Sequence, residues 1–172
     1  MAQTAEGTPQ GELERRHAAA ARVVQAVGLL TLLLLALALT GVLGGAIRFN
    51  PATANSLRII IVFLGVGAIV YRRTKFSAMR LQDIGALRGA AGLLRTLQAT
   101  TVTVALIGGL IALLGFLISL MTGFGTDMLY FGVIAAAVLL YCYPRRAAWR
   151  AVVAAAERGD ADPVRAAKGT TV

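Results

Sequence analysis

The sequence has little of what most enzymes use for chemistry. Its 172 residues include one cysteine (Cys142), one histidine (His17) and eight Asp and Glu residues. A single cysteine excludes an internal disulfide. None of the carboxylates lies inside an uncharged apolar segment, so we expect no intramembrane proton relay or ion site. The sequence therefore predicts no metal, no cofactor and no enzymatic activity.

Motifs for catalysis or nucleotide binding are also missing from the apolar segments. No histidine lies within them, which argues against paired-histidine haem ligation and against histidine-based metal sites. There is no Ser–His or Asp–Asp arrangement suited to an intramembrane hydrolase. The glycine-rich run at 41–45 lies in an apolar segment, so it does not resemble a phosphate-binding loop.

Apolar residues are abundant, and they are clustered. They make up 58 % of the chain, more than the roughly 45–50 % of an ordinary soluble domain. Residues 100–121 contain no charge, and residues 23–47 contain only Gln25 and two threonines as polar residues. About 20 residues are enough to cross the roughly 30 Å hydrocarbon core of a bilayer.

Two shorter apolar segments complete the set. Residues 59–71 and 128–143 are uncharged, and they reach spanning length when they are extended to include Arg58 and Asp127. Both charges fall at the same end of their segments, where their side chains are expected to extend to the membrane interface.

These segments predict an all-α integral membrane protein built as a four-transmembrane-helix bundle. The membrane domain is expected to cover residues 11–158, between disordered tails at 1–10 and 159–172. The expected spans are 23–47, 54–71, 98–121 and 125–143. The expected cytoplasmic helical segments are 12–22, 77–95 and 147–158.

The basic residues predict an orientation. Fifteen of the seventeen Lys and Arg residues lie in three segments on one predicted side, and only Arg48 and Arg58 lie on the other. The excess of positive charge on cytoplasmic loops then places both termini in the cytoplasm, in a cell membrane. Ala36-Leu37-Ala38 resembles a signal-peptidase site, but the apolar run continues past it, which favours an uncleaved chain.

Several landmarks recur 73 residues further along the chain. The first set is Arg15, Ala18, Arg22, Gln25 and Ala26, which fall on Arg88, Ala91, Arg95, Gln98 and Ala99; the second is Arg72-Arg73, which falls on Arg145-Arg146. The first set shares one face of a helix. This pattern favours two tandem parallel hairpins, with Gln25 and Gln98 facing each other across the bundle. Chance matching in a chain rich in Ala and Arg is the alternative.

Basic and aromatic residues adjoin each other at the predicted cytoplasmic edge. The formal net charge is +9, and its distribution around apolar spans favours anionic lipid headgroups over nucleic acid as a partner. The candidate lipid contacts are Arg72, Arg73, Lys75, Arg145, Arg146, Trp149 and Arg150. Trp149 is expected in an interfacial aromatic belt with Tyr141 and Tyr143, Pro144 is expected to end the fourth span, and His17 is expected to be solvated.

Small and amide residues mark the expected helix contacts. They are Gly41, Gly45, Gln25, Gln98, Gly132 and Ala136. Small side chains let helices approach closely in lipid, either within this bundle or against another membrane subunit or a second copy of the chain.

The leading functional hypothesis is a non-catalytic accessory, scaffold or assembly subunit of a membrane complex. The alternatives are a small oligomeric transporter or channel, and a membrane protein that interacts with anionic lipid.

Overall fold

The computed structural model describes residues 9–41, 51–75 and 78–158 of the chain. These residues form five helices, α1 (Pro9–Leu39), α2 (Pro51–Lys75), α3 (Ala78–Thr122), α4 (Gly125–Cys142) and α5 (Arg146–Arg158). Four of the helices are long and apolar enough to cross a membrane. The all-helical prediction with four apolar helices is thus confirmed at this level. Of the predicted tails at 1–10 and 159–172, residues 1–8 and 159–172 lie outside the described residues, whereas Pro9 and Gln10 belong to α1.

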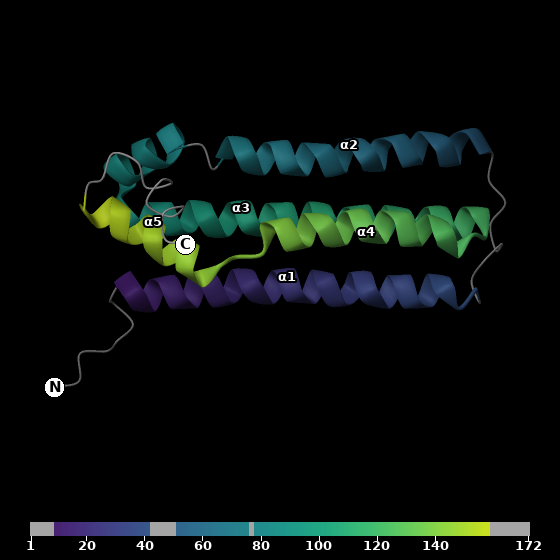
Figure 1. The fold of residues 1–172 in the computed structure, drawn as a ribbon, viewed down its shortest axis with the longest axis horizontal. Helices are drawn as coiled ribbons and strands as arrows, with labels where there is room; N and C mark the ends of the chain where they lie inside the picture. The colour runs from purple at the N-terminus through teal and green to yellow at the C-terminus, as the bar shows by residue number, and fades with distance from the viewer. Residues whose placement is uncertain (1–8, 42–50, 76–77, 159–172) are drawn as a thin grey trace, which may run out of the picture.

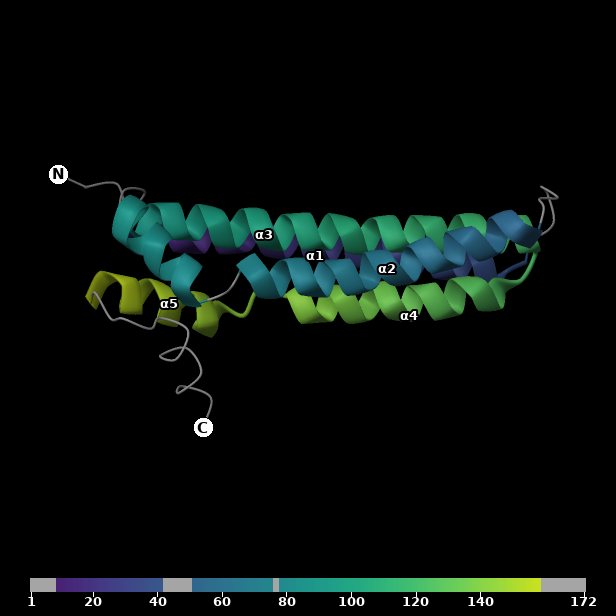
Figure 2. The same ribbon diagram turned by 90° about the horizontal axis from the view of Figure 1, so that it is seen from above.

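The four long helices run along one axis, with α1 and α2 on opposite sides of the α3–α4 pair (Figures 1 and 2). Helices α1 and α3 run in one direction, and α2 and α4 run in the other. We call the end that carries α5 the α5 end. The opposite end, where Leu39, Pro51 and Gly125 lie, is the turn end. Over the described residues α1 and α2 do not contact each other, whereas α3 packs against every other helix.

The observed helix boundaries join segments that the sequence analysis separated. Helix α3 is one helix of 45 residues, which covers both the predicted 77–95 segment and the predicted 98–121 span. Helix α1 likewise merges the predicted 12–22 and 23–47 segments, but it ends at Leu39. Gly41 follows with φ +67°, a left-handed conformation that commonly terminates helices. The apolar run continues past this point, so hydropathy alone overestimated the length of the helix.

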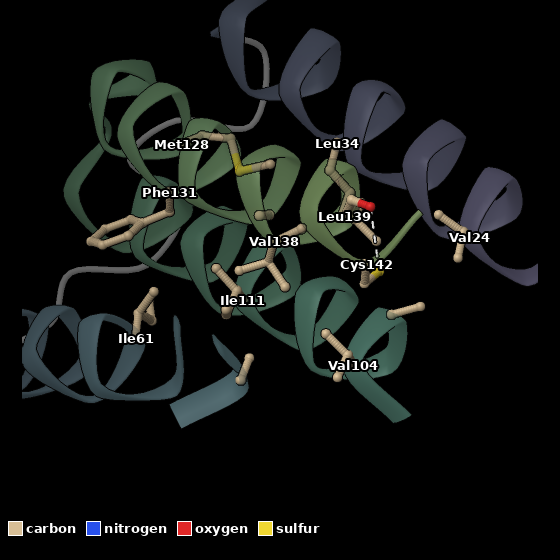
Figure 3. Close-up of a cluster of buried hydrophobic side chains, with 14 of the residues drawn as sticks. Val24, Leu34, Ile61, Val104, Ile111, Met128, Phe131, Val138, Leu139 and Cys142 are labelled. Atoms are coloured by element: carbon tan, nitrogen blue, oxygen red, sulfur yellow. Dashed lines mark hydrogen bonds between the residues drawn. The ribbon is translucent and has the colours of Figure 1, made fainter. Parts of the chain in front are cut away.

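The main core lies between α3 and α4 and extends to one face each of α1 and α2 (Figure 3). Ile61 of α2, Ile111 of α3 and Met128 of α4 are fully buried within it. At Gly115 the two central helices approach so closely that a Cβ atom would lie 2.6 Å from Cβ of Phe131. The two-residue turn that joins them begins with Gly123 at φ +73°, where residues with a Cβ are strained.

A second, smaller core lies at the α5 end. Trp149, Val152 and Val153 of α5 are buried against Leu93 and Leu97 of α3. Their spacing of three and four residues puts them on one face of the amphipathic helix. Helix α4 ends at Cys142 and α5 begins at Arg146, so Pro144 lies in the connection between them, as predicted. Helix α5 therefore continues beyond the end of α4 and packs against α1 and α3 (Figure 1).

Candidate functional site: polar contacts at the two ends of the bundle

At the turn end, an ion pair joins α2 to α4. Nη2 of Arg58 donates to both carboxylate oxygens of Asp127, at 2.9 and 2.8 Å. Asn55 accepts from Nη1 of Arg58 at 2.9 Å, and the Thr122 hydroxyl lies 2.9 Å from Oδ2 of Asp127. The Asp127 side chain is only 13 % exposed, against 39 % for Arg58. The two charges that were expected to reach the interface separately are thus paired with each other.

The turn between α3 and α4 is held by the same group of side chains. Oγ of Ser119 donates to the carbonyl oxygen of Phe124 at 3.1 Å, and the Phe124 amide donates to the Thr122 hydroxyl at 3.3 Å. Asp127 lies in the first turn of α4, where a negative charge favours the positive end of the helix dipole. The ion pair therefore attaches α2 to a turn that is already fixed by hydrogen bonds.

Helices α2 and α4 are aligned in parallel along their whole contact. Arg58 binds Asp127, the closest neighbour of a Cβ built on Gly65 is Ile134, and Arg72 lies over the ring of Tyr141. Each pair is separated by 69 residues in the sequence, and successive pairs are seven residues apart. A seven-residue spacing is two turns of a helix, which keeps one face of α2 against one face of α4.

At the α5 end, α2 finishes in three cations with different surroundings. The guanidinium carbon of Arg72 lies 4.5 Å from the ring centroid of Tyr141. Nζ of Lys75 lies 5.5 Å from the ring centroid of Tyr71. Arg73 is exposed. A cation above an aromatic face is attracted by the ring quadrupole, so two of the three predicted lipid contacts on α2 are already held by tyrosines.

The basic residues of α5 have an acidic partner within the chain. Nη2 of Arg146 lies 2.7 Å from Oε1 of Glu14, and Nη2 of Arg150 lies 3.7 Å from the same oxygen. All three side chains are more than half exposed, so these pairs contribute little stability. Arg145 is exposed. Glu14 therefore offsets part of the positive charge that the sequence analysis assigned to lipid.

Trp149 does not lie in an interfacial belt. Its side chain is buried in the second core, which corrects its prediction as a lipid contact, whereas Tyr141 and Tyr143 are exposed as expected. The ring of His17 meets Trp149 edge-on at a centroid distance of 5.5 Å, and its Nε2 lies 2.9 Å from the carbonyl oxygen of Pro144. His17 is therefore a partly buried contact between α1 and the α4–α5 connection, not a solvated side chain.

The predicted pairing of Gln25 with Gln98 is not present. Oε1 of Gln98 accepts a hydrogen bond from Nη1 of Arg16 at 3.2 Å, and Gln25 is exposed. The register of the helices explains the difference. Arg16 meets Gln98 and Val27 meets Gly109, which are both offsets of 82 residues. Gln25 therefore lies nine residues, or about 13 Å, beyond the level of Gln98 along α1.

The tandem-hairpin arrangement is not confirmed by the packing. Helix α3 packs against α4, but the described parts of α1 and α2 are not in contact. The packing offsets are 82 residues between α1 and α3 and 69 between α2 and α4, on either side of the predicted 73. A single two-fold axis along the bundle requires the same offset for both pairs, and these two differ.

The predicted small-residue contacts fall into different environments. Gly132 is buried, with a built Cβ 3.8 Å from Cδ1 of Leu35 in α1. Ala136 is exposed. Gly41 lies past the end of α1 with open space around it, and Gly45 lies outside the described residues. The close approaches occur instead at other glycines, where a built Cβ would lie 2.6–3.3 Å from the nearest atom of another helix. These are Gly65, Gly108, Gly109, Gly115 and Gly125.

Over the described ranges, no group of three His, Cys, Asp or Glu side chains is placed to hold a metal ion. Comparisons of the chain with protein families, with curated proteins and with solved structures give no match.

Proposed function

We propose that the chain is a multi-pass membrane protein with both termini in the cytoplasm. In support, large apolar side chains are exposed on all four long helices. Leu29 of α1, Phe63 of α2, Leu106 of α3 and Val133 of α4 are each between 58 and 71 % exposed. A hydrocarbon environment accepts such a surface, whereas water does not. The α5 end would be the cytoplasmic end, because the basic segments gather there.

The 73-residue match remains a proposal about descent. Duplication of one hairpin would account for the recurrence of Arg72-Arg73 as Arg145-Arg146. The two copies would then have diverged in packing, since α4 is a central helix and α2 a peripheral one.

The function we propose is that of a non-catalytic accessory or assembly subunit of a membrane complex. One observation carries this proposal, which is a face of α1 that holds two small residues and an amide and is left uncovered by the other helices. Gln25, Gly28, Leu32 and Ala36 are three or four residues apart and share a face of the helix. A Cβ at Gly28 would meet nothing within 4 Å, and Gln25, Leu32 and Ala36 are exposed. Small residues and amides are typical of helix–helix contacts in membranes.

The filled interior of the bundle also favours a function at its outer surface. Val104, Ile111 and Ile118 of α3 are fully buried and follow one another along the core. Thr31, which is buried in α1, donates its hydroxyl to the carbonyl oxygen of Val27 at 2.8 Å, so it is satisfied within its own helix. Over the part of the chain that the structure describes, this filled core favours the accessory function over a conducting path through one copy of the chain.

The test replaces the open glycine on α1. Gly28→Leu adds a large side chain to the proposed contact face, at a position where a Cβ would meet no atom within 4 Å. Gly67→Leu is the matched control on α2, where a Cβ also meets open space. The proteins are purified in mild detergent, and co-purifying chains are identified by mass spectrometry.

We expect a stoichiometric foreign subunit with the unmodified chain and with Gly67→Leu, and its loss with Gly28→Leu. A pure homo-oligomer that encloses a water-filled centre would overturn the accessory function in favour of the oligomeric transporter. Retention of the foreign subunit by Gly28→Leu would show that α1 is not the contact face.

A further inference from the structure

The outer edge of the α2–α4 contact carries two matched stripes of side chains. On α2 the stripe consists of Arg73, Ile69, Val66 and Val62, at spacings of four, three and four residues. Residues at these spacings follow one another along a helix face. Arg73 is exposed, and the three aliphatic side chains are 45, 55 and 49 % exposed. A cation therefore stands at the α5 end of an exposed aliphatic strip.

The stripe on α4 has the same spacing. It consists of Tyr141, Ala137, Ile134 and Tyr130. Tyr141 and Tyr130 are 50 and 70 % exposed, Ala137 is exposed, and Ile134 is half-buried. Each residue follows its counterpart on α2 by 68 positions in the sequence. Residues of α2 and α4 that contact each other are separated by 69 positions, which is only one more. The two stripes therefore run side by side at the same levels.

The cationic head of this double stripe is held in place by an aromatic contact. The guanidinium of Arg72 lies over Tyr141, with 4.5 Å between its central carbon and the ring centroid. Arg73 adjoins it in the last turn of α2, which also carries Lys75.

We propose that this edge binds one anionic phospholipid, with its phosphate at Arg72 and Arg73 and an acyl chain along the aliphatic strip. The inference rests on the proposal that the bundle spans a membrane. Guanidinium groups match phosphate oxygens in charge and geometry. Tyrosines are common at the headgroup level of a bilayer, and Ile69 and Ala137 offer a smooth apolar surface one turn below. An acidic protein segment would satisfy the cations but not the aliphatic strip.

The experiment measures lipid retained by the detergent-purified protein by native mass spectrometry, with phosphatidylglycerol and phosphatidylcholine offered at equal concentration. Arg73→Gln removes an exposed cation of the site. Arg22→Gln and Arg95→Gln are controls that remove exposed arginines elsewhere near the α5 end. We expect the wild type to prefer phosphatidylglycerol, Arg73→Gln to lose about fivefold of that retention, and the controls to keep it. Thermal unfolding shows that each variant is folded.

A second variant tests the acyl chain. Ala137→Trp covers the strip with a bulky side chain and leaves Arg72 and Arg73 unchanged. It should therefore lower retention of phosphatidylglycerol by blocking the acyl chain, with no change of charge. Equal retention of the two lipids by the wild type, or equal losses in Arg73→Gln and the controls, would overturn the site. Full displacement of the lipid by soluble glycerol phosphate would overturn the acyl contact. Release of the chain from membranes by alkaline carbonate would instead overturn the membrane proposal itself.

Discussion

A Cβ atom at position 65 would lie 3.1 Å from Cγ2 of Ile134, at the midpoint of the contact between α2 and α4. Its neighbour Gly67, on the same helix, would meet no atom within 4 Å. Gly65 and Gly67 lie on either side of Val66, and they differ in whether a larger side chain would fit. One is required by the packing of this chain, and the other faces outward.

This difference gives a matched pair of variants. Gly65→Val should lower the free energy of unfolding by about 1–3 kcal/mol, because the added atoms must displace Ile134 from a close contact. Gly67→Val has the same change in helix propensity and should be nearly neutral or stabilising. Unfolding midpoints in mild detergent measure both. Equal midpoints for the two variants would show that α2 does not approach α4 at this position.

The ion pair at the turn end should be energetically coupled. Asp127→Asn keeps the shape of the side chain but removes its charge, and we expect it to lower the free energy of unfolding by about 1–2 kcal/mol. The value is moderate because Arg58 is 39 % exposed and can find other partners. A double-mutant cycle with Arg58→Gln measures the coupling. Strictly additive single effects would mean that the two side chains act independently.

Trp149 reports on the docking of α5, because it is the one tryptophan in the chain. We expect blue-shifted emission and weak quenching by iodide, since the residue is only 4 % exposed. Val153→Asp should shift the emission to longer wavelength and raise the quenching, because it places a charge in the second core. Arg145→Asp is the control, as Arg145 is exposed. Identical spectra for the two variants would contradict the docked position of α5.

The register of α2 against α4 can be read by cross-linking. In a Cys142→Ala background, cysteines at positions 65 and 134 should form a disulfide under mild oxidation, since a Cβ at position 65 would contact Ile134. Cysteines at 65 and 138 have the 73-residue separation of the sequence match, and they should remain reduced. A disulfide between positions 65 and 138, with none between 65 and 134, would support the tandem arrangement over the observed packing.

The four apolar helices could be predicted from the sequence because each one is long, uncharged and continuous. The end of α1 could not be predicted this way, since Val42 and Leu43 continue the apolar run after Gly41 has already broken the helix. Hydropathy records solvent preference and not backbone conformation.

Residue contacts were harder to predict than helices. The match of Gln25 with Gln98 reflects resemblance between two segments, whereas their contact depends on how far the helices slide against each other. The arginines Arg145 and Arg146 that precede Trp149 favour a lipid contact in the sequence. The spacing of Trp149 to Val152 and Val153 would have indicated a buried face of α5.

The pairing of Arg58 with Asp127 was missed for a different reason. In the sequence, each charge is a single residue near the end of a short apolar span, with no sign of a partner beside it. Their common position at the turn end, in helices that run in parallel, was the signal that they could meet. Nothing in the sequence alone gives the 69-residue offset that brings them together.

The parallel alignment of α2 with α4 has a consequence for the order of events during synthesis. The partners of Arg58 and Arg72 are made 69 residues later, which at ribosomal speeds is a delay of roughly 3–14 s. During that interval α2 has neither its carboxylate nor its tyrosine, and it does not contact α1, the helix made before it. The newborn helix therefore packs first on α3, which follows it directly in the chain, and gains its contacts with α4 only when that helix is made.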